Sequence, residues 1–308
     1  MTSSHLPRGL WGVLATPFHG PRLDVDTNSL QREIDLYLSV PADGLVVLGV
    51  FGEGVALDAA EQAAVVSEVA KRAAGTPLVV GVSARTTAVA IEQAGTAVAS
   101  AGSDLAGVMV QANTTDPAVL TRHLTAVHDA TGAGIVLQDY PETSGVRITS
   151  DQLLDVVEHC PFVVAVKSEA PPTSAAVARL TASTDVPVFG GLGGVGLLDE
   201  LAAGAAGAMT DFSHPEGLRA ALDAWEHGGY AAARDAYAPW LPLVNFEAQP
   251  GIGLSLRKTI LRERGLFSDA AVRPPSRTAP QEILGLMPNH LAAAHDLLAS
   301  INLHDERS

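Results

Sequence analysis

A lysine ends one of the most apolar segments of the chain. In Phe162–Lys167, four consecutive small or β-branched residues precede Lys167, with Pro161 before the segment and Pro171 soon after it. Such a run predicts a short strand buried on both faces, as in a parallel sheet covered by helices. A neutral lysine amine held at the end of such a strand can attack a ketone carbon and form an imine. The alternative is a lysine that only extends from a strand end into solvent.

Two groups near this lysine could move protons. Successive residues of a strand face opposite sides, so Glu169 shares the face of Lys167, and Tyr140 shares the face of Gln138 after an earlier strand. An amide such as Gln138 cannot exchange a proton near neutral pH, whereas a carboxylate and a phenol can. The alternatives are a packed ring for Tyr140 and a solvated or helix-capping carboxylate for Glu169.

Composition and charge limit the kinds of partner that this chain can bind. The 308 residues are 47% hydrophobic, which suffices for a large core, and the formal net charge is −15. The negative charge disfavours binding to nucleic-acid phosphates or anionic membranes, but a small anionic substrate can still bind at a locally positive site. No apolar run reaches the ~18 residues of a membrane span, and the N-terminal segment lacks the form of a signal peptide. We expect a cytoplasmic protein that binds neither nucleic acid nor membrane.

The sequence gives no support for a metal or another cofactor. Cys160 is the single cysteine, which excludes an intramolecular disulfide and a cysteine-rich metal site. The histidines are scattered without convincing metal-ligand spacing. No Gly-x-Gly-x-x-Gly follows the first expected strand, and the glycine-rich stretch 190–196 lacks the lysine of a phosphate-binding loop. We expect this stretch, with Gly191, to let the backbone approach the substrate closely; ordinary tight turns are the alternative.

Strand-like and helix-like segments alternate over residues 1–227. They make eight strand–helix units in about 220 residues, which predicts a (β/α)₈ (TIM) barrel of the α/β class, because an open doubly wound sheet usually has fewer units. Residues 228–308 contain helical segments without strands, which predicts a C-terminal helical extension. The expected strands are Gly9–Phe18, Gly44–Gly49, Pro77–Val82, Leu105–Gln111, Gly134–Gln138, Phe162–Lys167, Val186–Gly190 and Gly207–Thr210. The expected helices of the extension are Tyr230–Leu243, Ile252–Arg264 and Gln281–Ile301.

In such a barrel the carboxyl ends of the strands form the active face. The turn Gly49–Glu53 follows the second expected strand, and its glycines allow backbone N–H groups to point at a carboxylate. Lys167 and Gly191 follow the sixth and seventh strands. An amine opposite a glycine-rich turn suits a 2-oxo acid, because the amine can attack the ketone while the N–H groups hold the carboxylate.

On these motifs the chain resembles the dihydrodipicolinate synthase/N-acetylneuraminate lyase family of Schiff-base (class I) aldolases and dehydratases. The resemblance covers nearly the whole chain and rests on Gly12–Phe18, Gly49–Glu53, Val163–Lys167, the pair Gly190 and Gly191, and the helical C-terminus. It implies that Lys167 forms the imine and that the chain assembles as a homo-oligomer, a tetramer in this family. The substrate-binding residues that it indicates are Gly49, Val50, Phe51, Gly52 and Gly191.

Several positions depart from the family pattern. The carboxylate-binding threonines of the family fall on Val50 and Phe51, so only backbone N–H groups remain there. The family's catalytic tyrosine falls on Gln138, and the arginine that binds an aldehyde-acid falls on Thr143. A second tyrosine, lent by a neighbouring subunit, falls near Gln111–Ala112. The lysine is kept and the usual proton relay is not, which disfavours dihydrodipicolinate synthase itself.

The sequence therefore predicts an imine-forming lyase, dehydratase or aldolase, that acts on a 2-oxo acid of the pyruvate or 2-oxo-3-deoxy sugar acid type. One alternative is a 4-hydroxy-tetrahydrodipicolinate synthase with relocated acid–base groups, and another is a barrel that only binds a ligand. Glu169 is favoured as the base, and Glu53 is expected to cap a helix or to tie the turn that contains it. The other lysines, Lys71 and Lys258, are expected in helices away from the strand ends. The expected catalytic residues are Lys167, Glu169, Tyr140 and Gln138.

Overall fold

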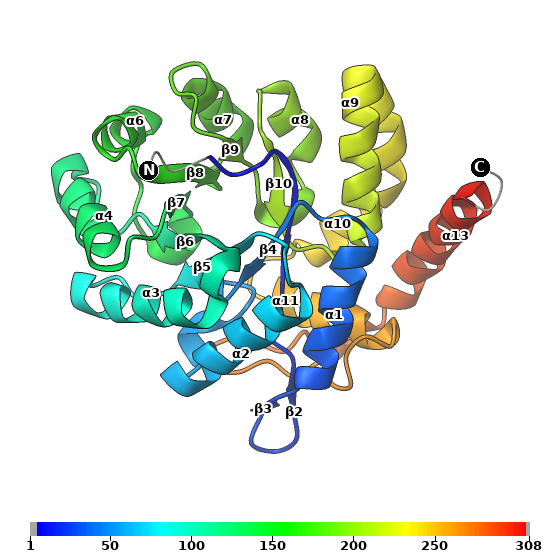
Figure 1. The fold of residues 1–308 in the computed structure, drawn as a ribbon. Helices are drawn as coiled ribbons and strands as arrows, with labels where there is room; N and C mark the ends of the chain where they lie inside the picture. The colour runs from blue at the N-terminus through cyan, green and yellow to red at the C-terminus, as the bar shows by residue number, and fades with distance from the viewer. Residues whose placement is uncertain (1–4, 306–308) are drawn as a thin grey trace.

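Eight parallel strands form a barrel in the computed structural model, which describes residues 5–305 (Figure 1). The strands are β1 (Gly9–Val13), β4 (Gly44–Val47), β5 (Leu78–Val82), β6 (Leu105–Gln111), β7 (Ile135–Asp139), β8 (Val163–Ser168), β9 (Val188–Phe189) and β10 (Gly207–Thr210). Their order in the sheet is β10-β1-β4-β5-β6-β7-β8-β9, and a bridge between Gly190 and Ala208 links the two end strands. The predicted (β/α)₈ barrel is thus confirmed.

Helices surround the barrel and cover the outer faces of its strands (Figure 1). Side chains cap several of them: Asp58 and Glu61 make a reciprocal capping box, and Asp116 accepts from two backbone N–H groups of the following helix. The helices of the barrel are α1 (Thr27–Ser39), α2 (Ala59–Arg72), α3 (Thr87–Ala101), α4 (Pro117–Thr131), α5 (Pro141–Ser144), α6 (Ser150–His159), α7 (Thr173–Thr181), α8 (Leu197–Ala202) and α9 (Pro215–Tyr237).

The first expected strand, Gly9–Phe18, is wrong in its second half. Strand β1 ends at Val13, and Phe18–His19 (β2) instead pairs antiparallel with Asp24–Val25 (β3). Pro17 lies between the two pieces, and a proline has no N–H with which to continue a central strand.

Inside the barrel an apolar layer lies below the strand ends and includes Met109, Val136, Ala165, Phe189 and Met209. Because side chains alternate along a strand, the residues two positions further on face the same side. These residues are polar on four strands, where the apolar layer gives way to the mouth of the barrel: Gln111, Gln138, Lys167 and Asp211.

The C-terminal extension consists of α10 (Leu241–Glu247), α11 (Gly253–Glu263), α12 (Gln281–Leu284) and α13 (Met287–Asp305). Two of its expected helices are wrong in extent. Residues 230–237 continue α9 across Gly229, whose φ of 63° interrupts the helix, and Pro239 prevents continuation as a regular helix to residue 243. Gly285, a poor helix former, separates α12 from α13, so residues 281–301 are not one helix.

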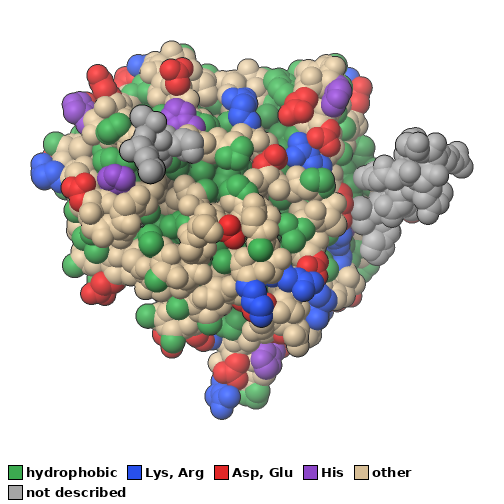
Figure 2. All heavy atoms as spheres, viewed as in Figure 1, with side chains coloured by type: hydrophobic (Ala, Val, Ile, Leu, Met, Phe, Trp, Pro, Cys, Tyr) green, Lys and Arg blue, Asp and Glu red, His purple; other side chains and the backbone are tan. Residues whose placement is uncertain are grey.

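Two global properties bear on the possible partners. No helix in residues 5–305 has the length and hydropathy to cross a membrane. On the described part of the face in Figure 2, Lys and Arg side chains lie among Asp and Glu side chains without forming a continuous basic patch. The structure therefore offers no basic surface on this face for a phosphate backbone.

Candidate active site

Lys167 lies at the mouth of the barrel, next to the last residue of β8. Its register partners are Gln138 of β7 and Phe189 of β9. The residue is buried, with 6% of its surface exposed, and its Nζ lies 3.4 Å from Oε1 of Glu169. The strand end thus places a largely water-shielded amine beside a carboxylate.

Two N–H groups donate to the carboxylate of Glu169, in addition to its contact with Lys167. Nε2 of Gln138 donates to Oε2 at 2.6 Å, and the backbone N–H of Leu192 donates to Oε1 at 3.2 Å. The backbone N–H of Glu169 itself donates to the carbonyl of Asp139 at 2.8 Å. Lys167, Glu169 and Gln138, all expected as site residues, therefore form one cluster, and neither sequence alternative for Glu169, a solvated carboxylate or a helix cap, describes its position.

Gly191 makes this cluster possible. A Cβ at Gly191 would lie 2.2 Å from Oε1 of Glu169, a distance that no real side chain tolerates. The absence of a side chain is thus required for the carboxylate to pack against the turn that follows β9. The predicted contact between Gly191 and a substrate remains a prediction.

We expect Gly191→Ala to lower activity through Glu169. The added methyl must push the carboxylate away from Lys167, so kcat should fall by on the order of 10²-fold, since an ångström of misplacement can have that effect. Overpacking should also destabilise the fold by about 1–3 kcal/mol. Steady-state kinetics and thermal melting measure both effects. Gly95→Ala is the matched control, because Gly95 lies in α3 with nothing within 4 Å of its Cβ position, and it should leave both properties unharmed.

Tyr140 lies one residue beyond β7 and is half-buried. Burial raises the pKa of its phenol to about 12, and the charge of Glu169 contributes further. A phenol that holds its proton this tightly is a poor base near neutral pH, so the geometry favours Glu169 over Tyr140 for proton abstraction.

The turn after β4 is tied to the C-terminal extension. Glu53 accepts hydrogen bonds from Nζ of Lys258 and, at 2.8 Å, from the backbone N–H of Arg273. The expectation that Glu53 ties the turn thus agrees with its contacts. The expectation that Lys258 lies away from the strand ends is wrong: α11 packs against the mouth of the barrel, and Lys258 is fully buried there.

The remaining residues of this turn are closely packed. A Cβ at Gly52 would lie 2.8 Å from the backbone N of Leu48, so only glycine fits. The ring of Phe51 stacks under the guanidinium of Arg257, with Cζ 4.3 Å from the ring centroid. Gly49 and Val50 line a cavity, which leaves their backbone accessible to a small ligand.

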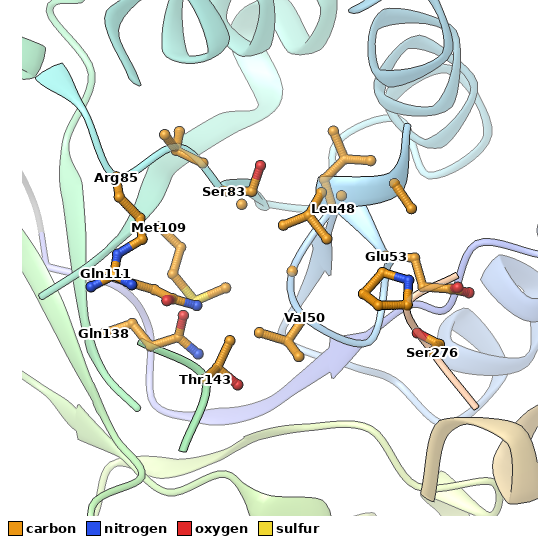
Figure 3. A pocket seen from close by; sticks show the side chains of 17 residues that line it. Leu48, Val50, Glu53, Ser83, Arg85, Met109, Gln111, Gln138, Thr143 and Ser276 are labelled. Carbon is orange, nitrogen blue, oxygen red and sulfur yellow. The ribbon is translucent and has the colours of Figure 1, made fainter. Parts of the chain in front are cut away.

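Two cavities open around this cluster. The first has a volume of about 290 Å³, and Val50, Gln138 and Thr143 border it in Figure 3. The second, of about 540 Å³, lies between the barrel mouth and the extension and is lined by residues that include Phe51, Tyr140, Leu192, Gly193 and Arg257. Val50 lines both. Lys167 does not line either cavity. The two residues that donate hydrogen bonds to Glu169 do line them: Gln138 lines the first cavity and Leu192 lines the second.

Sequence reasoning missed three charged residues of this region. Arg85 lines the first cavity, Asp211 follows β10, and Arg257 reaches the mouth from α11. Strand alternation could have identified Asp211, because it shares the inward face of Met209. Nothing in the sequence places Arg257, because the packing of a distant helix decides where it lies.

Two more buried carboxyl groups surround Glu169. Burial raises the pKa of Asp139 to about 6 and that of Glu200 to about 7, and in both cases the charge of Glu169 contributes. Oδ1 of Asp139 and Oε1 of Glu200 have no hydrogen-bond partner among the described residues. The mouth therefore holds several buried acidic groups around Glu169, which favours a ligand that brings a positive charge or a hydrogen-bond donor.

Within residues 5–305 no cluster of three or more His, Cys, Asp or Glu side chains has the geometry to hold a metal ion. Cys160 is buried, and burial raises the pKa of its thiol, as expected for a structural cysteine.

Comparison with known proteins agrees with the geometry. Residues 6–293 match the model of the dihydrodipicolinate synthetase family. The chain is 29% identical over 287 residues to L-2-keto-3-deoxyarabonate dehydratase of Azospirillum brasilense, which covers 89% of this chain and 91% of that protein. It is 34% identical over 254 residues to 4-hydroxy-tetrahydrodipicolinate synthase of Kineococcus radiotolerans, covering 79% and 80% of the two chains.

Among solved structures, the dihydrodipicolinate synthase of Rhodopseudomonas palustris superposes with a TM-score of 0.86 at 31% identity. The superposition covers 94% of this chain and 100% of that one. The chain therefore belongs to the dihydrodipicolinate synthetase family. It is an enzyme of the lyase type found there, as the sequence predicts.

Proposed function

We propose that the protein is an imine-forming dehydratase of a 2-oxo-3-deoxy sugar acid. The observation that carries the proposal is the buried pair of Lys167 and Glu169, with Nζ and Oε1 3.4 Å apart and Glu169 fixed by Gln138 and Leu192. The pair supplies a nucleophile and a separate base within reach of one small ligand.

The reaction follows from these two groups. The amine of Lys167 attacks C2 of the substrate, water leaves, and the resulting iminium draws electrons from C3. Glu169 takes a proton from C3, which gives an enamine. The enamine then expels the C4 hydroxyl, which leaves as water once it has gained a proton. Water finally adds to C2 and releases the 2-oxo product and the free amine.

Dehydration is favoured over carbon–carbon cleavage by the relative that is a dehydratase of a 2-keto-3-deoxy sugar acid. The aldol reaction needs the same imine and stays the alternative within the same mechanism.

A second candidate is the synthase that condenses pyruvate with an aldehyde-acid. One observation favours it: Arg85 and Thr143 line the same cavity, so Arg85 could bind the acid group of an aldehyde-acid in place of the arginine that Thr143 replaces. Against it, Gln138 stands where the family has its proton-relaying tyrosine.

Borohydride trapping against a panel of 2-oxo acids tests the proposed function. Each acid is incubated with the protein and borohydride, and intact mass identifies the reduced adduct. The acids that give an adduct are then supplied without borohydride, and the products are analysed for loss of water or for cleavage. Pyruvate release from a 2-oxo-3-deoxy sugar acid would favour the aldolase, and the absence of any adduct would refute the imine mechanism.

We expect little synthase activity. A positioned acid–base group contributes on the order of 10²–10⁴ in rate, and Gln138 cannot supply it. A coupled assay with pyruvate and aspartate semialdehyde should therefore show turnover far below the ~1–10³ per second of ordinary enzymes. Turnover within that range would establish the second candidate, and Arg85→Ala should then abolish it.

A cytoplasmic location, and the homotetrameric assembly that the family resemblance implies, belong to the same proposal. The small-molecule site and the acidic net charge of −15 are compatible with both.

A further inference from the structure

Asp211 is a buried carboxyl group at the mouth that the mechanism above does not use. It is the first residue after β10 and lies two residues beyond Met209 of the apolar layer, so it shares the inward face of that strand. Only 8% of its surface is exposed. Its Oδ2 accepts a hydrogen bond from Nη1 of Arg257. The amine of Lys167 is close enough to act electrostatically on this carboxyl group. Asp211 therefore places a second buried carboxyl group, besides Glu169, within electrostatic range of the nucleophile.

Arg257 is shared between two acids. Its Nη1 binds Asp211, and its Nε binds Oε2 of Glu247 at 3.0 Å. All three residues are buried, and burial raises the pKa of both carboxyl groups. One guanidinium can balance only one of the two negative charges. The two carboxyl groups together therefore favour retaining one proton between them while no further positive charge lies beside them. Asp211 interacts electrostatically with six titratable or charged groups around it: Lys167, Arg257, Glu247, Tyr140, Glu33 and Tyr37.

The position of this trio is built into the fold. Arg257 stacks on Phe51, and a Cβ at Gly193 would lie 2.3 Å from Nη2 of Arg257, so the glycine leaves room for the guanidinium. Gly193 is itself fixed, because its N–H donates to Oγ1 of Thr210 at 2.8 Å. The arginine is thereby locked between the turn after β4, the turn after β9 and the end of β10.

We propose that Asp211 is the acid that completes imine formation at Lys167, since Gln138 stands where the family has its proton-relaying tyrosine. The inference rests on the proposed function. The attack of the amine on C2 gives a carbinolamine, and Asp211 gives its proton to the carbinolamine hydroxyl. The C2–O bond breaks, water leaves, and the nitrogen lone pair forms the C2=N bond. The carboxylate of Asp211 then balances the iminium charge, and the same steps in reverse hydrolyse the product imine.

The two carboxyl groups at the mouth thus have different tasks. Glu169 accepts hydrogen bonds from Gln138 and Leu192 on its two oxygens and lies beside Nζ of Lys167, so its contacts suit a group that accepts a proton. Asp211 shares a single cation with Glu247, so its environment favours a retained proton. Glu169 suits the abstraction at C3, and Asp211 suits the donation at the C2 oxygen.

Rapid-quench trapping tests the assignment. Pyruvate is mixed with the protein, borohydride is added after varied delays, and intact mass follows the rate at which the Lys167 adduct appears. Asp211→Asn should slow this rate by on the order of 10²-fold, the lower range for a positioned acid. Asp211→Glu keeps a carboxylic acid and should restore part of the rate. Asp26→Asn is the control, because Asp26 is a buried carboxyl group that caps α1 by accepting from the backbone N–H of Ser29, and its replacement should leave the rate unchanged.

The pH dependence of the wild-type protein gives a readout that needs no variant. The rate of adduct formation should rise with pH as the amine loses its proton and then fall as Asp211 loses the proton that it must donate. A rate that rises without a falling limb would overturn the assignment, as would an Asp211→Asn protein, folded by thermal melting, that forms the adduct as fast as the wild type. A wild-type protein that forms no adduct at all would instead refute the proposed function.

Discussion

Lys167→Ala should form no borohydride-trapped adduct with any 2-oxo acid, and its turnover should fall by on the order of 10⁴-fold or more, as when covalent enzymes lose their nucleophile. Lys167→Arg should fail equally, because a guanidinium keeps the positive charge beside Glu169 but is not deprotonated in proteins and cannot attack a ketone. The arginine variant therefore separates the loss of the nucleophile from the loss of the ion pair. Intact mass after trapping, with peptide mapping of the adduct, provides the measurement.

The chain offers a matched control, because it has only two other lysines. Lys71 is exposed on α2, so Lys71→Arg should leave trapping and turnover as in the wild type. Lys258 is fully buried and bonded to Glu53 and to the carbonyl of Ala271, which leaves it no access to a substrate. An adduct mapped to either residue would contradict the assignment of Lys167.

The fold was predictable because its signals are local. A buried parallel strand is a short β-branched run between turn residues, as in Val163–Val166, and each run is followed by a segment of helical spacing. Lys167 and Glu169 were predictable for the same reason, since their shared face follows from strand alternation alone. The errors lie where one residue interrupts a pattern, as Pro17 does after β1.

Contacts between distant segments were not predictable. Glu53 and Lys258 are 205 positions apart, and helical periodicity places Lys258 on α11 without saying against what α11 packs. Arg257, its neighbour, reaches Asp211 and Glu247 for the same reason. The acids and bases of a barrel mouth come from strand ends, but the helices that cover the mouth decide the charges around them.

Glu169→Gln should leave the Lys167 adduct intact and slow the later chemistry by on the order of 10²–10⁴-fold, the usual contribution of a general base. Imine formation needs the amine and an acid, whereas only the next step needs a group that accepts the C3 proton. Exchange of the pyruvate methyl protons in D₂O, followed by NMR, reports this step without knowledge of the true substrate. Exchange should nearly cease in Glu169→Gln while trapping proceeds.

Tyr140→Phe is the matched comparison, because it removes the other candidate group. The pKa of Tyr140 is raised to about 12 by burial, so the phenol is not a base near neutral pH, and its loss should leave exchange close to the wild-type rate. Wild-type exchange in Glu169→Gln, together with slow exchange in Tyr140→Phe, would reverse the two assignments.

The contacts of Glu169 also predict which of its oxygens acts. Oε2 accepts from Gln138 at 2.6 Å and Oε1 accepts from the backbone N–H of Leu192 at the longer distance of 3.2 Å, and Oε1 also lies 3.4 Å from Nζ of Lys167. We therefore expect Oε1, the more weakly bonded oxygen and the one that faces Nζ, to take the C3 proton of an imine formed on Nζ. Gln138→Ala should lower exchange less than Glu169→Gln, because it frees the carboxylate to rotate but leaves the base in place. An equal loss in both variants would show that Gln138 does more than hold Glu169, since loss of the orienting hydrogen bond alone does not remove the base.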